Sequence, residues 1–424
     1  MKNQARHRSP WLVVLGSGLA QTVGIGPLIL STFGLFVLPI AAKTGWSRAT
    51  VSVAFTAAAV GFAIGTPVAG HLLDRYAYRI VVIPSWILYA VSVASIAVVP
   101  CSLPVFYLPF LMAGFFAGGT FLPAFKAVLS WFDNKRGLAI GVVAAIGALG
   151  ASLTPVLARA LMNSVGWRQA YAWMALVAAA VSVTMITTLV KVRAEQSHRG
   201  RLVQAAGASD RASILELPGL NVREALASRH LWMISAILCL SGLAVIGIQV
   251  NVVPMMTDEG LRAGQAASLL SVYAGASLTG RLVSGALLDH VPARFVTAVV
   301  LLCPVAGMVL LRPPFASAAV GIALVGVAFG MEIDVLSFLI SRYLGMRRFG
   351  SLFGIVYFGV LSVSAFGPLA INYGHQVFGN YRSIFPAIAA ALVLCSLTSL
   401  FLGPYRYPAV HGFDQAVQRP PERV

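Results

Sequence analysis

Long apolar segments separated by short polar ones follow one another along almost the whole chain. Each is close to 20 residues or longer, the length that an α-helix needs to cross a hydrocarbon core of about 30 Å. None shows the alternation of a membrane β-strand, and backbone in lipid must satisfy its own hydrogen bonds. The pattern predicts an all-α integral membrane protein with about twelve transmembrane helices. The expected spans are 11–40, 50–73, 79–100, 105–131, 137–162, 168–191, 230–256, 263–288, 294–312, 315–341, 350–372 and 382–403.

The sequence repeats itself at an offset of about 214 residues. "GHLLDRYAYR" (70–79) matches "GALLDHVPAR" (285–294), and Gly137 matches Gly350 at a similar offset. Several matches with one offset predict two pseudo-symmetric six-helix halves, with a substrate site between them near the bilayer midplane. The expected parts are an N-terminal half at 1–191, a cytoplasmic linker at 192–229, a C-terminal half at 230–405 and a cytoplasmic tail at 406–424.

Composition agrees with a membrane protein. The chain is 58% hydrophobic and 10% charged, whereas soluble domains carry about 25% charged residues. The net charge of +17 does not indicate nucleic acid, because the basic residues flank apolar segments. Loops on one side hold most of them, and the other side holds only Lys43, Arg48, Arg168, Arg262, Arg312 and Arg382. The positive-inside rule then places both termini in the cytoplasm.

Enzyme chemistry is not expected. The four cysteines lack metal-ligand spacing, the seven histidines are scattered, and the phosphate-binding loop of ATPases is missing. We expect no metal and no cofactor. The remaining function classes are a secondary transporter and, as an alternative, a membrane sensor, for which the chain offers no soluble domain.

At the 70–79 stretch the chain resembles the major facilitator superfamily. "GHLLDRYAYR" is similar to the signature of its loop between helices two and three, with Ala77 in place of the usual glycine. The resemblance implies a conformational latch, in which an Asp at a helix end binds basic residues or a neighbouring helix N-terminus; a simple topology marker is the alternative. The expected latch residues are Gly70, Asp74, Arg75 and Arg79, and in the second copy Gly285, Asp289 and Arg294.

Four further stretches resemble the monocarboxylate transporter and oxalate/formate antiporter branch. They are "GWSRATVS" (45–52), "WFDNKRGLAIG" (131–141), "GWRQAY" (166–171) and "LNVREALASRHLW" (220–232). This branch implies a helix-eight arginine that binds a substrate carboxylate, and Arg281 occupies that position. The chain departs from the branch at Ser277, where an acid is often found, and in helix eleven, which carries no lysine.

Charges inside membrane helices are costly and therefore informative. At 1.5 Å per residue, Arg281 and Asp334 lie about 12 Å from the inner surface, Glu332 about 15 Å and Lys126 about 10 Å. Arg281 can grip a carboxylate with its planar fork; a structural ion pair is the alternative. Lys126 can add a second cation to the cavity or extend its amine to the inner surface.

Glu332 and Asp334 are candidates for proton coupling. Two residues apart on a helix, they point about 200° away from each other. We expect Asp334 to pair with Arg281 and Glu332 to face the cavity and carry the proton. The reverse assignment is one alternative, and a static structural pair is another.

Other polar residues are weaker candidates for substrate binding. Gln21, Gln249, Asn251 and Tyr357 can equally form hydrogen bonds between helices. The sequence thus predicts a multi-pass transporter of the cell membrane, in bacteria the inner membrane, that moves a small organic anion, a monocarboxylate, with protons. Alternatives are transport of a larger compound (a drug, a siderophore or an aromatic acid) or anion exchange without protons. The expected partners are the anion, protons and lipid, with no nucleic acid, and the protein is expected to be a monomer.

Overall fold

The structure, a computed structural model, describes residues 9–99, 102–132, 135–190 and 218–407. Within these ranges the chain forms helices and no strand, so the prediction of an all-α membrane fold is confirmed. Ten helices are long and apolar enough to cross a membrane. One of them, α6, comprises two helices across a kink, and α10 is a further 28-residue helix. Together these account for the twelve expected crossings.

The N-terminal half contains the elements up to residue 190. The first span is broken into three pieces around Gly24 and Thr32, as its glycines and Pro27 suggest. In α6, Gly166 has φ of 81°, a conformation that glycine adopts freely, and the two helices meet there. The elements are α1 (Trp11–Gln21), η1 (Gly26–Leu30), α2 (Phe33–Thr44), α3 (Arg48–Arg75), α4 (Tyr78–Ser95), α5 (Leu103–Leu129) and α6 (Arg136–Thr188).

The C-terminal half repeats this order. Its eleventh span is interrupted before Gly367, and its tenth ends in a short π-helix. The elements are α9 (Arg229–Asp258), α10 (Ala263–His290), α11 (Ala293–Leu310), α12 (Phe315–Leu339), η2 (Ile340–Leu344), α13 (Phe349–Ser364), α14 (Gly367–Phe378), η3 (Tyr381–Ile384) and α15 (Phe385–Leu400).

A short segment before the second half docks onto it. Most of the expected linker, residues 192–217, and all but two residues of the tail lie outside the described residues. The described end of the linker forms α8 (Val222–Leu226). Leu220 N–H donates to the Leu344 carbonyl at 2.9 Å, and Met346 N–H donates to the Pro218 carbonyl at 2.9 Å. The linker end is therefore attached to the C-terminal half.

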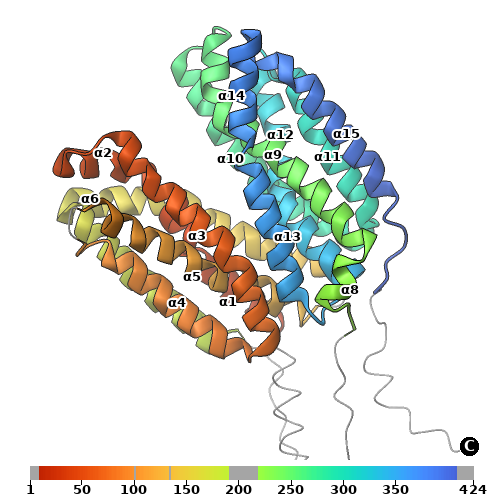
Figure 1. Ribbon diagram of the computed structural model, residues 1–424, viewed down its shortest axis with the longest axis horizontal. Coiled ribbons are helices and arrows are strands. Elements are labelled where there is room, and N and C mark those ends of the chain that lie inside the picture. The colour runs from red at the N-terminus through yellow and green to blue at the C-terminus, as the bar shows by residue number, and fades with distance from the viewer. Residues whose placement is uncertain (1–8, 100–101, 133–134, 191–217, 408–424) are drawn as a thin grey trace, which may run out of the picture.

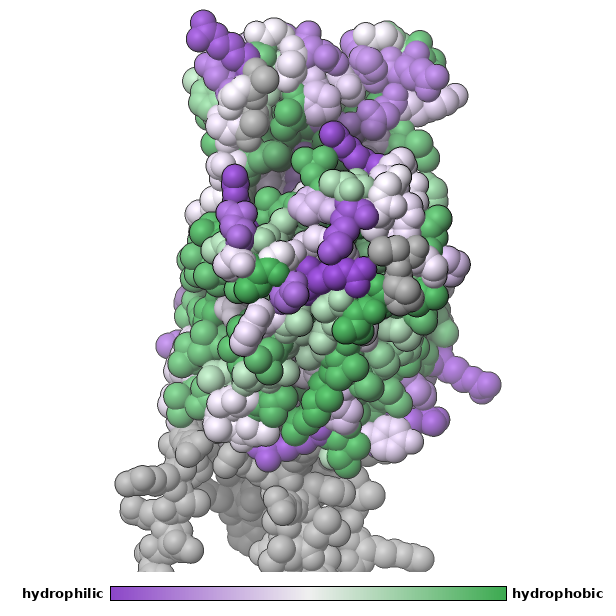
Figure 2. Space-filling model, turned by 90° about the vertical axis from the view of Figure 1, so that its left-hand side faces the viewer, coloured by the Kyte–Doolittle hydropathy of each residue, from purple (hydrophilic) through white to green (hydrophobic). Residues whose placement is uncertain are grey.

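The two halves form separate helix bundles that meet at one end. They lie together near α8 and diverge toward the end that carries α2 and α14 (Figure 1). On the left-hand side of the molecule as drawn in Figure 1, hydrophilic side chains gather at the top and across the middle, and apolar ones dominate below (Figure 2). Many apolar side chains on the outside of both bundles are exposed, among them Leu153, Val156, Val299 and Leu394, as expected for helices that face lipid.

The repeat is visible in side-chain contacts as well as in helix order. Arg168 donates to the Ala97 carbonyl at 3.1 Å in the first half, and Arg382 donates to the Leu311 carbonyl at 3.4 Å in the second. Both pairs of positions are 214 residues apart along the sequence. The same arginine therefore braces the same turn in each half.

Candidate functional site

Arg281 lies on α10 where the second half meets the first. A Cβ built on Gly141 of α6 would be 2.3 Å from the Arg281 carbonyl oxygen, so the two helix backbones touch at this point. The side chain is half-buried, and its guanidinium carbon lies 6.0 Å from the centre of the Phe329 ring. Its Nε is buried and has no hydrogen-bond partner in the described part of the chain. The guanidinium therefore keeps donor capacity for another group.

Asp334 lies behind Arg281 and is fully buried. Its Oδ2 is 2.6 Å from the Ser284 hydroxyl on α10, and that hydroxyl is also 3.0 Å from the Arg281 carbonyl oxygen. The other carboxyl oxygen, Oδ1, has no hydrogen-bond partner among the described residues. Asp334 thus joins α12 to α10 with half of its hydrogen-bonding capacity unused.

Glu332 points to the opposite side of α12. A Cβ built on Gly242 of α9 would lie 3.2 Å from Glu332 Oε1 and 2.1 Å from the Ser364 hydroxyl. The carboxyl group therefore lies beside α9 and α13, whereas Asp334 faces α10. This divergence is what a spacing of two residues on a helix requires.

The direct ion pair expected for Arg281 is not formed in this conformation. Among the described residues, no oxygen of Glu332 or Asp334 lies within 4.0 Å of an Arg281 nitrogen. The reason is geometric, because Asp334 is held by Ser284 and Glu332 is turned toward α9. Arg281 is nevertheless close enough to both carboxyl groups to interact with them electrostatically.

Aromatic side chains from both halves border this cluster. Tyr357 on α13 stacks on Phe121 of α5 at 5.5 Å between ring centres, and its edge contacts Phe62 of α3 at 6.0 Å. Tyr357 also interacts electrostatically with Glu332 and Arg281. The site therefore combines a charged side, from the C-terminal half, with an aromatic side to which the N-terminal half contributes.

The remaining polar candidates serve mainly as contacts between or within helices. Gln21 donates to the Thr120 carbonyl at 2.8 Å, and buried Asn251 donates to the Gly247 carbonyl at 2.9 Å. Gln249 accepts a bond from the Tyr273 hydroxyl at 3.4 Å, which brings it to the edge of the cluster through a neighbour. The structure therefore groups only Gln249 and Tyr357 with the ionisable residues.

Lys126 lies at the latch residue Asp74 and not in the expected substrate cavity. Its ammonium group is 2.7 Å from Asp74 Oδ1 and donates to the Leu73 carbonyl at 2.8 Å. The Asp74 side chain is fully buried, and a buried carboxylate needs a paired charge. The expectation that Lys126 adds a second cation to the cavity is therefore corrected, because the amine is held at the latch.

The two copies of the loop signature make equivalent contacts between the halves. Asp74 accepts the backbone N–H groups of Gly350 at 3.1 Å and Ser351 at 2.7 Å. Asp289 accepts those of Gly137 at 2.9 Å and Leu138 at 3.0 Å.

In both cases a carboxylate caps the N-terminus of a helix from the opposite half, where the helix dipole favours negative charge. Glycine makes this approach possible, since a Cβ on Gly70 would lie 2.1 Å from the Gly350 carbonyl oxygen.

The three arginines of the expected latch lie elsewhere. Arg79 donates to the Thr187 carbonyl at 3.2 Å, within its own half. Arg294 lies over the ring of the adjacent Phe295, and Arg75 borders a surface cavity. Of the expected latch residues, those that contact the opposite half are thus Gly70, Asp74, Gly285 and Asp289.

Sequence reasoning missed several neighbours of the site. Ser284, Tyr273, Phe329, Phe62 and Phe121 were not proposed, because polar and aromatic residues are common in membrane helices. One signal was present, since Ser284 follows Arg281 by three residues and shares its helix face. No group of three or more His, Cys, Asp or Glu residues that could hold a metal occurs in the described ranges.

Comparison with known proteins gives one family. The model of the Major Facilitator Superfamily matches residues 11–368. The uncharacterized MFS-type transporter YhjX of Escherichia coli (strain K12) is 25% identical over 359 residues, covering 83% of this chain and 85% of that protein. Monocarboxylate transporter 13 of Bos taurus is 26% identical over 404 residues, covering 93% of this chain and 89% of that protein.

A solved structure agrees at the level of the fold. The Escherichia coli fucose:proton symporter FucP superposes with a TM-score of 0.68 at 14% identity, covering 93% of this chain and 98% of that chain. The matched family and these relatives are transporters rather than enzymes. The chain belongs to the major facilitator superfamily and is a multi-pass membrane transporter.

Proposed function

We propose that this major facilitator transporter carries a small organic anion, a monocarboxylate, together with protons. The observation that carries the proposal is Arg281, a half-buried guanidinium at the meeting point of the two halves that forms no ion pair among the described residues. A charge at this depth is costly. A substrate carboxylate would satisfy it.

The surroundings of Arg281 suit an amphipathic anion. The planar guanidinium can hold both oxygens of one carboxylate, and its buried Nε still lacks an acceptor. The rings of Phe121 and Tyr357 offer an apolar surface for the body of the substrate. One fixed cation fits a monoanion better than a dicarboxylate, and Lys126 is held at the latch.

Proton coupling follows from the charges around Arg281. If Glu332 and Asp334 were both ionised, the cluster would carry one net negative charge and repel an anion. Each proton taken up raises the charge by one, so a doubly protonated cluster would attract a carboxylate with one net positive charge. Since all three groups interact electrostatically, proton uptake and anion binding would favour each other.

The hydrogen bonds of Ser284 allow Asp334 to gain or lose one of these protons in place. Its single hydroxyl proton has two acceptors within reach, the Arg281 carbonyl and Asp334 Oδ2. When the proton lies toward the carbonyl, Asp334 can keep a hydrogen bond to the hydroxyl only by supplying its own proton. Asp334 can therefore be bound in either protonation state without a rearrangement of α10 and α12.

The latches define the conformation. We assign the joined end of the molecule, with α8 and both signatures, to the cytoplasm, because the basic loops lie there. The conformation is then closed to the cytoplasm, and the halves diverge toward the outside (Figure 1). Release of the substrate inward requires both Asp74 and Asp289 to leave their helix N-termini. Cytoplasmic termini and a place in the cell membrane of a bacterium are part of this proposal.

A second candidate is favoured by the aromatic side of the site. Phe62, Phe121 and Tyr357, with Phe329 next to Arg281, form more ring surface than a very small acid needs. Such a surface fits a larger carboxylate, an aromatic acid above all. Exchange of two anions, without net proton movement, is the corresponding alternative for the coupling.

Uptake of labelled carboxylates into proteoliposomes tests the proposal. The panel contains short aliphatic monocarboxylates, aromatic acids and dicarboxylates, each with and without an inward proton gradient. We expect uptake of a monocarboxylate that the gradient accelerates and that Arg281→Ala abolishes, whereas Arg262→Gln, at the exposed start of the same helix, leaves it unchanged. Absence of carboxylate uptake, or full activity of Arg281→Ala, would overturn the proposal.

A further inference from the structure

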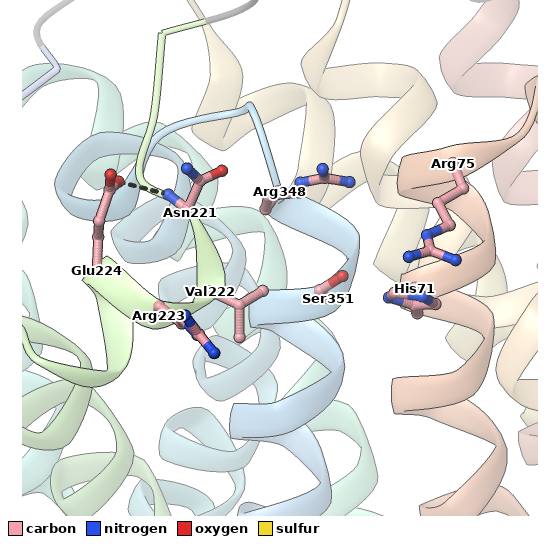
Figure 3. A pocket seen from close by; sticks show the side chains of 8 residues that line it. All are labelled: His71, Arg75, Asn221, Val222, Arg223, Glu224, Arg348 and Ser351. Atoms are coloured by element: carbon pink, nitrogen blue, oxygen red, sulfur yellow. Dashed lines mark hydrogen bonds between the residues drawn. The ribbon is translucent and has the colours of Figure 1, made fainter.

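A cavity lies at the joined end of the molecule, and Arg281 is not among its lining residues. Its volume is 690 Å³. The lining residues come from α3, α8 and the start of α13: His71, Arg75, Asn221, Val222, Arg223, Glu224, Arg348 and Ser351 (Figure 3). The cavity is therefore bounded by both halves of the protein and by the end of the linker.

The lining is basic and largely unsatisfied. The lining contains three arginines and one histidine but a single carboxylate, Glu224, which lies to one side and accepts the Asn221 N–H at 2.7 Å (Figure 3). Arg348 extends from the turn before α13 toward α3, the helix that carries Arg75 (Figure 3). The Ser351 hydroxyl is buried and has no hydrogen-bond partner in the described part of the chain. Like charges held around a cavity repel one another unless an anion lies between them.

The walls of the cavity belong to two bodies that must separate during transport. His71 and Arg75 belong to the N-terminal half. Arg348 and Ser351 belong to the C-terminal half, to which α8 is attached through Leu220 and Met346. The backbone N–H of Ser351 also donates a hydrogen bond to Asp74, so the cavity adjoins one latch directly.

We propose that this cavity binds an anion with a phosphate group, and that the bound anion holds the cytoplasmic side closed. A phosphate has several acceptor oxygens, which match arginine forks and a free hydroxyl. The anion would contact both halves only while they are joined, so it binds one conformation better and shifts the population toward it. The site is thus a brake on transport, separate from the substrate site, and it does not rest on the identity of the substrate.

The test measures amide hydrogen exchange at Gly350 and Ser351, the latch amides, in the purified full-length protein. One arm adds pyrophosphate in neutral detergent, and the other compares nanodiscs of phosphatidylcholine with and without phosphatidylglycerol. We expect exchange to slow several-fold in at least one arm. A response to pyrophosphate alone assigns a soluble anion, and a response to phosphatidylglycerol assigns a lipid headgroup.

Variants separate the site from general electrostatics. Arg348→Gln removes one charge-assisted contact and is expected to weaken binding about tenfold. Arg223→Gln, at an exposed position of α8, is a second variant that is expected to weaken binding. Arg406→Gln removes a charge from an exposed position after α15 and serves as the control, with less than a twofold effect. No slowing in either arm, or equal effects of Arg348→Gln and Arg406→Gln, would refute the proposal. Since no transport is measured, its failure is distinct from failure of the proposed function.

Discussion

The two halves use the same packing where α3 meets α5 and where α10 meets α12. A Cβ on Gly118 would lie 2.4 Å from the Gly65 carbonyl carbon, and a Cβ on Gly330 would lie 2.0 Å from the Ser277 carbonyl oxygen. Gly118 and Gly330 are 212 residues apart and occupy equivalent positions. Close contact of small residues is a common way to pack membrane helices. It is the part of the design that the two halves share.

The same two helix pairs differ in the chemistry that they carry. Thr66 of α3, which donates to its own helix at the Phe62 carbonyl, stands where α10 has Arg281. With Gly118 equivalent to Gly330, Thr120 and Leu122 of α5 stand where α12 has Glu332 and Asp334. Packing is therefore a property of the repeat, whereas the ionisable groups of the candidate substrate site, Arg281, Glu332 and Asp334, belong to the second half. The difference separates the scaffold from the site.

The largest expected effect is on the shared packing. Gly118→Ala and Gly330→Ala each place a methyl group against backbone and are expected to lower stability by about 3 kcal/mol. The thermal unfolding midpoint of the purified protein is the measurement. Gly275→Ala on α10, where a Cβ would meet nothing within 4 Å, is the matched control. A large loss of stability in only one of the two glycine variants would show that the two halves do not share this packing.

Although the two latches have equivalent geometry, we expect the Asp74 latch to stabilise the joined state more than the Asp289 latch. Asp289→Asn removes a charge from a helix N-terminus, worth about 1 kcal/mol. Asp74→Asn also leaves Lys126 without its partner, so the joined state should lose about 2–3 kcal/mol. Hydrogen exchange of the amides that each Asp binds measures the loss.

Lys126→Met provides the control for this inequality. In the Asp74→Asn background it removes the unpaired cation, and the double variant should return to the level of Asp289→Asn. If Asp74→Asn and Asp289→Asn increased the hydrogen exchange of their latch amides equally, Lys126 would not contribute to the latch.

Sequence reasoning reached the scaffold because the scaffold is repeated. The helix spans and the two halves follow from hydrophobic length and one constant offset, and the latch carboxylates Asp74 and Asp289 follow from the resemblance of the 70–79 stretch to the superfamily signature and from its repeat. The break in the first span lies at Gly24, just before Gly26 and Pro27, residues that are visible in the sequence. These features depend on local composition and on spacing, both of which are visible in a single chain.

The partners of individual charges could not be reached in this way. Lys126 was expected either to add a cation to the cavity or to extend toward the inner surface, but its side chain pairs with Asp74 on α3. A direct ion pair with Glu332 or Asp334 was expected for Arg281. Instead, Asp334 is hydrogen-bonded to Ser284, and the rotation of α12 turns Glu332 toward α9. Rotation of packed helices and side-chain reach are set by three-dimensional contacts, which sequence spacing does not determine.

The smallest expected effects concern the aromatic side of the site. Phe121→Ala removes the ring that stacks on Tyr357 and should raise KM for the carried carboxylate roughly three- to tenfold. Tyr357→Phe keeps the ring and should change KM less than threefold. Initial uptake rates in proteoliposomes give both values. If Tyr357→Phe had the larger effect, the hydroxyl would bind substrate, and the N-terminal half would contribute less than proposed.

The central claim is that anion and proton chemistry belong to the C-terminal half alone. The most direct measurement is accumulation of the carried carboxylate in proteoliposomes under an inward proton gradient, compared for wild type and Glu332→Gln/Asp334→Asn. The account predicts that the double variant still exchanges carboxylate across the membrane when no gradient is present, but no longer accumulates it in response to the gradient. Accumulation by the double variant to the wild-type level would contradict the account, because the proton would then be carried elsewhere.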